Sequence, residues 1–183
     1  SDSVLETMTH FKTVWPAIAS EKLKEGEQVG LYMEDGILYA GKKESSATGT
    51  VLKEANKGTD VALCGLNGII YMSIGEADII TLPTVKNGGS GASDLELIQK
   101  IYEKGTEHGG EINKVAIIGT VSRSIANQLN LPVDIEFAVA AGTANACRKG
   151  LNVLVLSVGD MTKAFIRELE DEKIKFNIID GVK

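Results

Sequence analysis

The clearest pattern along the chain is a set of short, continuous apolar runs that begins at residue 77 and alternates with amphipathic segments. The apolar runs predict strands at 77–85, 114–119, 133–140, 151–159 and 175–179. The amphipathic segments predict helices at 94–104, 122–130, 143–149 and 160–172. Such an order is typical of a parallel sheet covered on both faces and joined by right-handed crossovers. We therefore predict an α/β fold whose C-terminal part is a three-layer, Rossmann-like parallel sheet.

The first 76 residues show a different pattern. Apolar residues recur at three- and four-residue spacing over 4–18, which predicts a helix. Pro16 either kinks this helix or begins a second short one. A further short helix is expected at 47–58.

Two similar stretches, 29–41 and 61–73, each place a turn dipeptide between apolar runs. Asp35-Gly36 and Asn67-Gly68 are strong signals for tight hairpins, so we predict two β-hairpins. Their similarity indicates either an internal duplication or only the features that any two hairpins share. The hairpins could extend the sheet as edge strands or cap a ligand crevice.

We expect one domain over residues 1–183. Within it, residues 1–76 would form the helix and two hairpins, and residues 77–183 would form the alternating β/α unit. No stretch rich in Pro, Gly and Ser is long enough to require two independent domains.

Composition and charge narrow the possible partners. The chain has 183 residues, a net charge of −6 and a sequence pI of about 5.0. An acidic surface disfavours nonspecific binding to nucleic acid or to an anionic membrane. Cys64 and Cys147 form no zinc-binding pattern, so we expect no metal site. The polar start SDSVLETM and the absence of a long apolar run favour a cytoplasmic location.

Candidate chemistry lies in the turns that follow the predicted strands. Ligands of open parallel sheets bind at the carboxyl ends of the strands, near the point where the strand order reverses. Four turns should lie there, at 87–93, 119–124, 141–145 and 157–160. Each would place free backbone N–H groups at a helix start, where the helix dipole favours an anion.

The glycine-rich turn is the first candidate. Gly88, Gly89 and Gly91 would let the backbone approach an anion closely, and Ser90 and Ser93 could add hydroxyl donors. The turn matches neither a Walker A motif nor the dinucleotide fingerprint. The alternative is a flexible connector in which Ser93 is an ordinary helix N-cap.

The second turn places Arg123 beside Thr120 and Ser122 at a helix start. A guanidinium close to hydroxyl and N–H donors suits a phosphate or carboxylate. An arginine in a first helical turn opposes the dipole, which is a reason to expect a ligand, and the alternative is an exposed residue on a solvated helix face.

The remaining candidates follow later strands. Thr143 and Asn145 are expected at a helix start and are assigned to ligand binding. Asp160 could contact a ribose hydroxyl, a base or a metal-bridged phosphate, or it could be an N-cap only. Cys147 could be a nucleophile of lowered pKa or a small buried apolar residue. Asp160 and Cys147 are the weak candidates for a catalytic role.

These features predict a protein that binds a small anionic, phosphorylated metabolite or nucleotide at the strand ends. If it is an enzyme, transfer or hydrolysis at that anion is favoured over redox chemistry, because no dinucleotide fingerprint is intact. The sequence identifies no cofactor. The alternative is a non-catalytic, homo-oligomeric or regulatory subunit that uses the apolar hairpins as its interface. Its contact residues would include Tyr32, Tyr39, Tyr71 and Met72.

Overall fold

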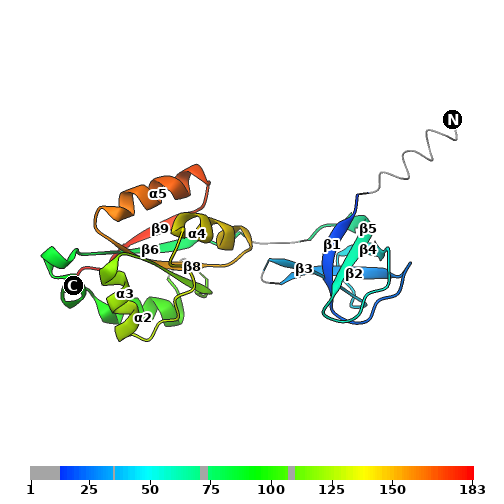
Figure 1. Ribbon diagram of the computed structural model, residues 1–183, viewed down its shortest axis with the longest axis horizontal. Coiled ribbons are helices and arrows are strands. Elements are labelled where there is room, and N and C mark those ends of the chain that lie inside the picture. The colour runs from blue at the N-terminus through cyan, green and yellow to red at the C-terminus, as the bar shows by residue number, and fades with distance from the viewer. Residues whose placement is uncertain (1–12, 35, 71–73, 107–109) are drawn as a thin grey trace. The chain divides into compact units, whose positions relative to one another are not determined.

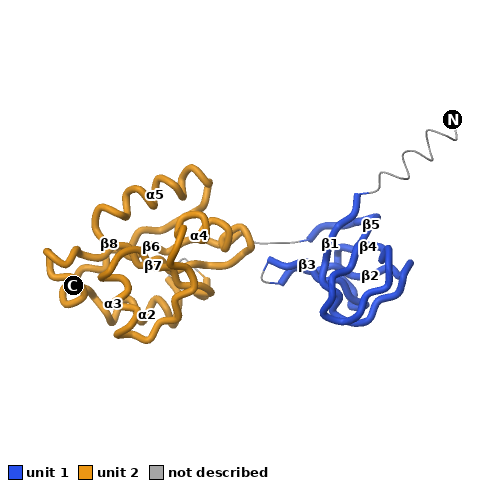
Figure 2. Tube along the Cα trace, in the orientation of Figure 1, with its two compact units in different colours: residues 1–72 blue, residues 73–183 orange. Residues whose placement is uncertain are grey.

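The computed structural model describes residues 13–34, 36–70, 74–106 and 110–183. The chain divides into two compact units, Ser1–Met72 and Ser73–Lys183 (Figure 2). The boundary lies four residues before the change of pattern expected at residue 77. The expectation of a single domain over the whole chain stays a prediction.

The N-terminal unit is a closed five-stranded barrel with the strand order β1-β3-β2-β4-β5 (Figure 1). Neighbouring strands are antiparallel except β1 and β3, which run parallel. Its core includes the fully buried side chains of Leu31 in β2 and Leu63 in β5, and Leu23 in the connection between β1 and β2 is fully buried with them. The strands are β1 (Trp15–Ala19), β2 (Gln28–Glu34), β3 (Ile37–Gly41), β4 (Ala47–Val51) and β5 (Asp60–Gly68).

The barrel confirms one of the two predicted hairpins. Strands β2 and β3 are antiparallel, and Gly36 in the turn between them has a φ of 76°, which glycine adopts without strain. The second predicted hairpin is wrong, because β5 continues through Asn67 to Gly68 and both residues pair with β4. The expected turn signal instead ends a strand.

Two predicted helices in this region also need correction. Much of the helix predicted at 4–18 lies outside the described residues, and its last part is wrong because Trp15–Ala19 forms strand β1. Pro16 fits that strand and neither kinks nor begins a helix there. The helix predicted at 47–58 is wrong as well, because β4 occupies Ala47–Val51 and closes the barrel between β2 and β5.

The C-terminal unit contains a small four-stranded parallel sheet with the order β7-β8-β6-β9. All six residues of β8 are buried, as expected for a continuous apolar run in the middle of a parallel sheet. The strands are β6 (Ala77–Leu82), β7 (Lys114–Ile118), β8 (Val153–Val158) and β9 (Phe176–Asp180).

Four α-helices lie on the two faces of this sheet (Figure 1). The helices α2 and α3 contribute Ile98 and Ile125 to the core on one face. The helices α4 and α5 contribute Ala144 and Phe165 to the core on the other. Their bounds are α2 (Leu95–Lys104), α3 (Thr120–Gln128), α4 (Val139–Arg148) and α5 (Met161–Asp171), and two 3-10 turns, η1 (Val85–Asn87) and η2 (Gly89–Ala92), precede α2.

The prediction of a three-layer, Rossmann-like sheet with an appended helix and hairpins is wrong. The protein is a mixed α/β fold that combines a closed barrel with a small parallel sheet. In the Rossmann order, the first strand lies next to the second. Here β8 lies between the first two strands of the unit, β6 and β7. The strand predicted at 133–140 does not form. Ile135 makes a single bridge to Ala116, and α4 already begins at Val139.

Candidate functional site

The carboxyl end of the parallel sheet brings the predicted turns together. The turn after β8 contacts the end of β6, because the backbone N–H of Gly159 donates to the carbonyl of Leu82 at 3.1 Å. The turn after β7 contacts β8, because a Cβ on Gly119 would lie 3.0 Å from a methyl of Val158. From β6 the chain passes to α2 on one face, and from β8 it passes to α5 on the other. In open sheets, ligands bind at the carboxyl ends of two adjacent strands whose following helices pack on opposite faces of the sheet.

Three helices begin at this end without a side-chain cap. Among the described residues, no side chain accepts a hydrogen bond at the start of α3, α4 or α5, and none of the three first turns contains an acidic residue. Helix α2 differs, because Asp94 accepts from the N–H of Leu97 at 3.1 Å. The three uncapped starts therefore retain free N–H groups and their positive dipole ends.

A hollow of about 400 Å³ joins these three starts, and we call it the anion hollow. Arg123 lies in it and forms an ion pair with Glu136, with 2.5 Å between nitrogen and oxygen. Both side chains are about two-fifths exposed. The lining residues are Ile117, Ile118, Gly119, Thr120, Arg123, Glu136, Val139 and Met161.

Some predicted ligand residues lie at this hollow and others beside it. Thr120 and Arg123 line it. Ser122 is fully buried, and its hydroxyl donates to the carbonyl of Ile118 at 2.9 Å, so it is already engaged with the end of β7. Asp160 is exposed at the start of α5, next to Met161 of the lining, and makes no cap there among the described residues.

The glycine-rich stretch forms an ordered pair of 3-10 turns. The hydroxyl of Ser93 donates to the carbonyl of Gly89 at 2.9 Å, and the Ser93 N–H donates to Ser90. Gly88 has a φ of 108°, which favours glycine. Ser90, Gly91 and Ser93 line a separate hollow of about 430 Å³ that includes Lys183. The stretch thus neighbours the anion hollow without forming its wall.

The candidates on α4 lie farther from the strand ends. Thr143 is fully buried, and its hydroxyl has no partner among the described residues. Asn145 is exposed in the second half of the helix. The carbonyl of Cys147 accepts from the N–H of Gly75, which precedes β6, so Cys147 lies near the amino end of the sheet.

The surroundings of Cys147 do not favour a thiolate. The side chain is fully buried. Burial raises the pKa of the Cys147 thiol to about 11, and the charges of Glu76 and Asp78 act in the same direction. A nucleophilic cysteine needs the opposite environment.

Sequence reasoning missed two features of the anion hollow. Glu136 was assigned to a predicted strand, yet it pairs with Arg123. Ala138 adopts a left-handed conformation with φ 47° and ψ 50° immediately before α4. A non-glycine residue held in this region is often found at functional sites. The pattern of residues 133–140 predicted a strand, and it gave no signal for the ion pair of Glu136 or for the left-handed conformation of Ala138.

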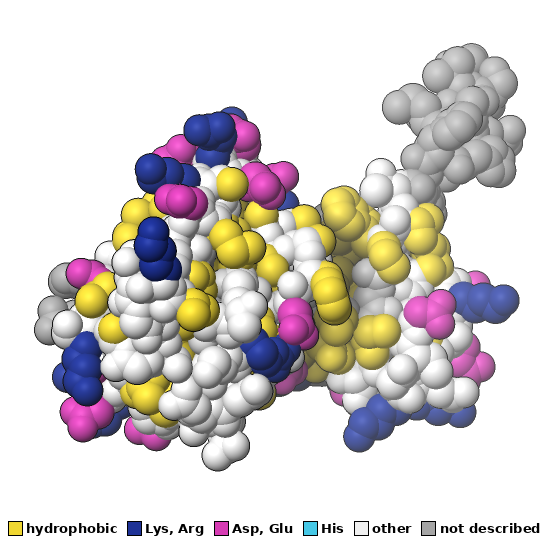
Figure 3. All heavy atoms as spheres, turned by 60° about the vertical axis from the view of Figure 1, so that its left-hand side comes forward, with side chains coloured by type: hydrophobic (Ala, Val, Ile, Leu, Met, Phe, Trp, Pro, Cys, Tyr) yellow, Lys and Arg dark blue, Asp and Glu magenta, His cyan; other side chains and the backbone are white. Residues whose placement is uncertain are grey.

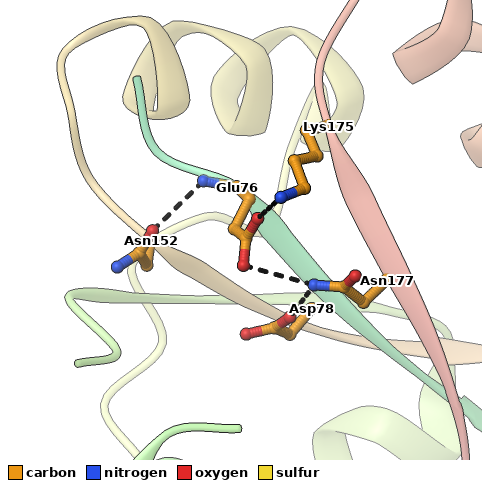
Figure 4. Close-up of polar contacts among 5 residues, drawn as sticks. All are labelled: Glu76, Asp78, Asn152, Lys175 and Asn177. Carbon is orange, nitrogen blue, oxygen red and sulfur yellow. Dashed lines mark hydrogen bonds and ion pairs between the residues drawn. The ribbon is translucent and has the colours of Figure 1, made fainter. Parts of the chain in front are cut away.

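A partly buried polar cluster at the amino end of the sheet was also missed (Figure 4). The side-chain amide of Asn177 donates to Asp78 at 2.8 Å and to Glu76 at 3.3 Å. Glu76 also pairs with Lys175 at 3.2 Å, and its N–H donates to Asn152. The second carboxylate oxygen of Asp78 is buried without a partner in the described part of the chain. The pKa of the Asp78 carboxyl is raised, chiefly by burial. The hydrogen bond from Asn177 acts in the opposite direction and lowers the pKa, and the negative charge of Glu76 raises it further.

This environment predicts that Asp78→Asn stabilises the protein at neutral pH. Unfolded Asp78 loses its proton near its ordinary pKa of 3.8, whereas the folded protein retains it to higher pH. Asp78 therefore lowers the free energy of unfolding as pH rises above 3.8 toward the raised pKa. We expect Asp78→Asn to gain about 1 kcal/mol at neutral pH and nothing below 3.8, measured by urea unfolding. The exposed Asp60→Asn is the control, and a loss of stability at neutral pH would contradict the prediction.

No group of three or more His, Cys, Asp or Glu side chains among the described residues could hold a metal ion. No helix in the described ranges is both long enough and apolar enough to cross a membrane.

Comparison with known proteins gives a family. Residues 71–178, which include the anion hollow and the amino-end cluster, match the family described as a domain of unknown function, DUF7839. An uncharacterized protein of Methanocaldococcus jannaschii is 36% identical over 183 residues, which is 100% of this chain and 68% of that protein. No solved structure matches the chain. The chain therefore belongs to the DUF7839 family.

Proposed function

We propose that this protein binds a small phosphorylated ligand at the carboxyl end of its parallel sheet, in the anion hollow. The observation that carries the proposal is the convergence of three uncapped helix starts with one arginine. Backbone N–H groups at helix starts bind phosphate well because their geometry and dipole both favour a negative group. Arg123 adds a planar donor pair that matches two phosphate oxygens.

Glu136 is the residue that opposes an anion here. Its pair with Arg123 is partly exposed, and such pairs contribute only about 0–1 kcal/mol. A phosphate with several N–H donors can displace this carboxylate from the guanidinium. In the free protein Glu136 holds Arg123 over the hollow, and on binding it would turn toward solvent.

The chemistry of such a site would be transfer or hydrolysis at the phosphoryl group. The helix starts and Arg123 would stabilise charge on the equatorial oxygens, which is the main requirement of phosphoryl transfer. Asp160, exposed next to Met161 of the lining, would be the carboxylate that accepts a proton from an attacking hydroxyl. Cys147 is left out of this proposal because it is buried at the other end of the sheet.

A calorimetric titration with phosphorylated and neutral compounds tests the proposal. The panel is inorganic phosphate, ribose 5-phosphate and citrate, with ribose as the neutral control. We expect ribose 5-phosphate to bind and ribose not to. At 100 times its dissociation constant, such a ligand stabilises the fold by about 2.7 kcal/mol, which a thermal scan detects. If no phosphorylated compound binds at millimolar concentration, the proposal is wrong.

The first hairpin of the barrel supports a second candidate, self-association. Tyr32 and Tyr39 stack with ring centroids 5.6 Å apart, and Ile37, on the same face of β3 as Tyr39, is 44% exposed. Aromatic and aliphatic side chains of this kind are enriched in interface cores. We expect Ile37→Asp to lower the mass measured by light scattering if a second copy covers this face. An unchanged monomeric mass for both proteins would exclude this interface.

A further inference from the structure

A second hollow adjoins the anion hollow, and we call it the apolar hollow. It measures about 470 Å³, within the range of small-molecule sites. Its walls are the start of α4, Ala138–Ala141, and one side of α5, including Ala164 and Phe165. Ile118, Val139 and Met161 line both hollows, so the two adjoin, and we call them together the depression.

The two parts of this depression differ in chemistry. The anion hollow contains the Arg123–Glu136 pair and the start of α3. The apolar hollow is lined mainly by alanine and larger apolar side chains, and Glu168 is the charged residue in its wall. A carboxylate at this position disfavours a second anionic group and can accept hydrogen bonds from N–H donors. The depression therefore suits a ligand that is anionic at one end and apolar, with N–H groups, at the other.

An exposed aromatic residue lies, in the sequence, between residues that line the two hollows. Phe137 is 87% exposed, the most exposed of the large apolar side chains in the described residues. It lies between Glu136, which lines the anion hollow, and Ala138, which lines the apolar hollow. Ala138, which follows Phe137, has a left-handed backbone conformation that is unusual for a residue other than glycine. Figure 3 brings this end of the sheet toward the viewer and shows hydrophobic side chains exposed among charged ones.

We propose that the ligand is a nucleotide whose phosphate occupies the anion hollow and whose base occupies the apolar hollow, where the exposed ring of Phe137 would turn to stack on it. This inference rests on the proposed function and deepens it by naming the ligand class. A planar base buries apolar area against the alanines of α4 and α5 and stacks on an aromatic ring. Its exocyclic amine can donate to Glu168.

A calorimetric comparison of AMP, ribose 5-phosphate and inorganic phosphate tests the inference. We expect AMP to bind at least tenfold more tightly than ribose 5-phosphate, because only AMP carries the base. Equal affinities for AMP and ribose 5-phosphate would overturn the inference and leave the proposed function intact. If none of the three binds, both proposals fail.

Two variants locate the base. Phe137→Ala should weaken AMP binding about five- to fiftyfold, because stacking on an aromatic ring is lost. Ala164→Leu should weaken it similarly by filling the apolar hollow with an exposed substitution on α5. Neither variant should alter ribose 5-phosphate binding. Val85→Ala, which removes another exposed apolar side chain and lies in η1, away in the sequence from the residues of both linings, is the matched control. Unchanged AMP affinity in both variants would overturn the placement.

Discussion

Replacing Arg123 with alanine is expected to weaken the binding of ribose 5-phosphate about ten- to a hundredfold. A hydrogen bond to a charged group contributes about 1.5–3 kcal/mol, and 1.4 kcal/mol is tenfold in affinity. Arg123 lies in the anion hollow with one partner, Glu136, so its loss removes the cation without opening the core. Calorimetric titration of the two proteins at the same ionic strength measures the difference, since salt screens this interaction.

Glu136→Gln is expected to have the opposite effect, raising the affinity up to about fivefold. The substitution removes a negative charge from the hollow and releases Arg123 from an ion pair worth about 0–1 kcal/mol. Opposite changes in these two variants are difficult to explain by a general loss of folding. They would therefore place the phosphate between the helix starts and the guanidinium.

A matched arginine provides the control. Arg148 also forms an ion pair, with Glu172, and lies at the last residue of α4, away from the anion hollow. Arg148→Ala should leave the affinity unchanged. If Arg123→Ala and Arg148→Ala weaken binding equally, the effect is one of net charge, and the assigned site is wrong.

Leu156→Ala is expected to lower the free energy of unfolding of the C-terminal unit by about 2–5 kcal/mol. Leu156 is fully buried in β8 and is paired with both Ile80 and Ile117. Truncation leaves a cavity that the neighbouring strands cannot fill, because each is hydrogen-bonded on the side facing β8. Urea unfolding monitored by far-ultraviolet circular dichroism measures the loss.

The same variant tests whether the chain unfolds as one domain. Trp15 is the single tryptophan and belongs to the barrel, so its fluorescence reports on the N-terminal unit. Because each unit has its own buried core, we expect Leu156→Ala to leave the midpoint of the Trp15 transition unchanged. Leu63→Ala in the barrel core is the reciprocal control and should shift it. A common shift of both signals in both variants would instead support a single cooperative domain over residues 1–183.

Much of the C-terminal unit could be predicted from local pattern. The strands β6, β7, β8 and β9 and the helices α2, α3 and α5 lie close to the expected ranges. Gly105 follows the last residue of α2, and Asp94 rather than Ser93 supplies the cap at its start. Local pattern succeeded here because continuous apolar runs and 3.6-residue periodicity arise from burial that each element experiences separately.

The barrel shows where local pattern fails. The stretch 61–73 carries the same hairpin signal as 29–41, yet only the latter turns back on itself. In the former, Asn67 and Gly68 pair with Thr48 and Ala47 of β4. This partner is distant in sequence, and the gain from closing the barrel outweighs the local turn preference.

The candidate site divides in the same way. The sequence by itself determined that Thr120, Arg123 and Asp160 lie at or near helix starts that follow buried strands, because these assignments depend on neighbouring residues. Only the tertiary structure decided that Glu136 meets Arg123, that the starts of α3, α4 and α5 share one hollow, and that Cys147 lies at the other end. These relations depend on strand order and on the bend at Ala138. Strand order and the bend at Ala138 depend on contacts between residues that are distant in the sequence, and no local sequence pattern encodes such contacts.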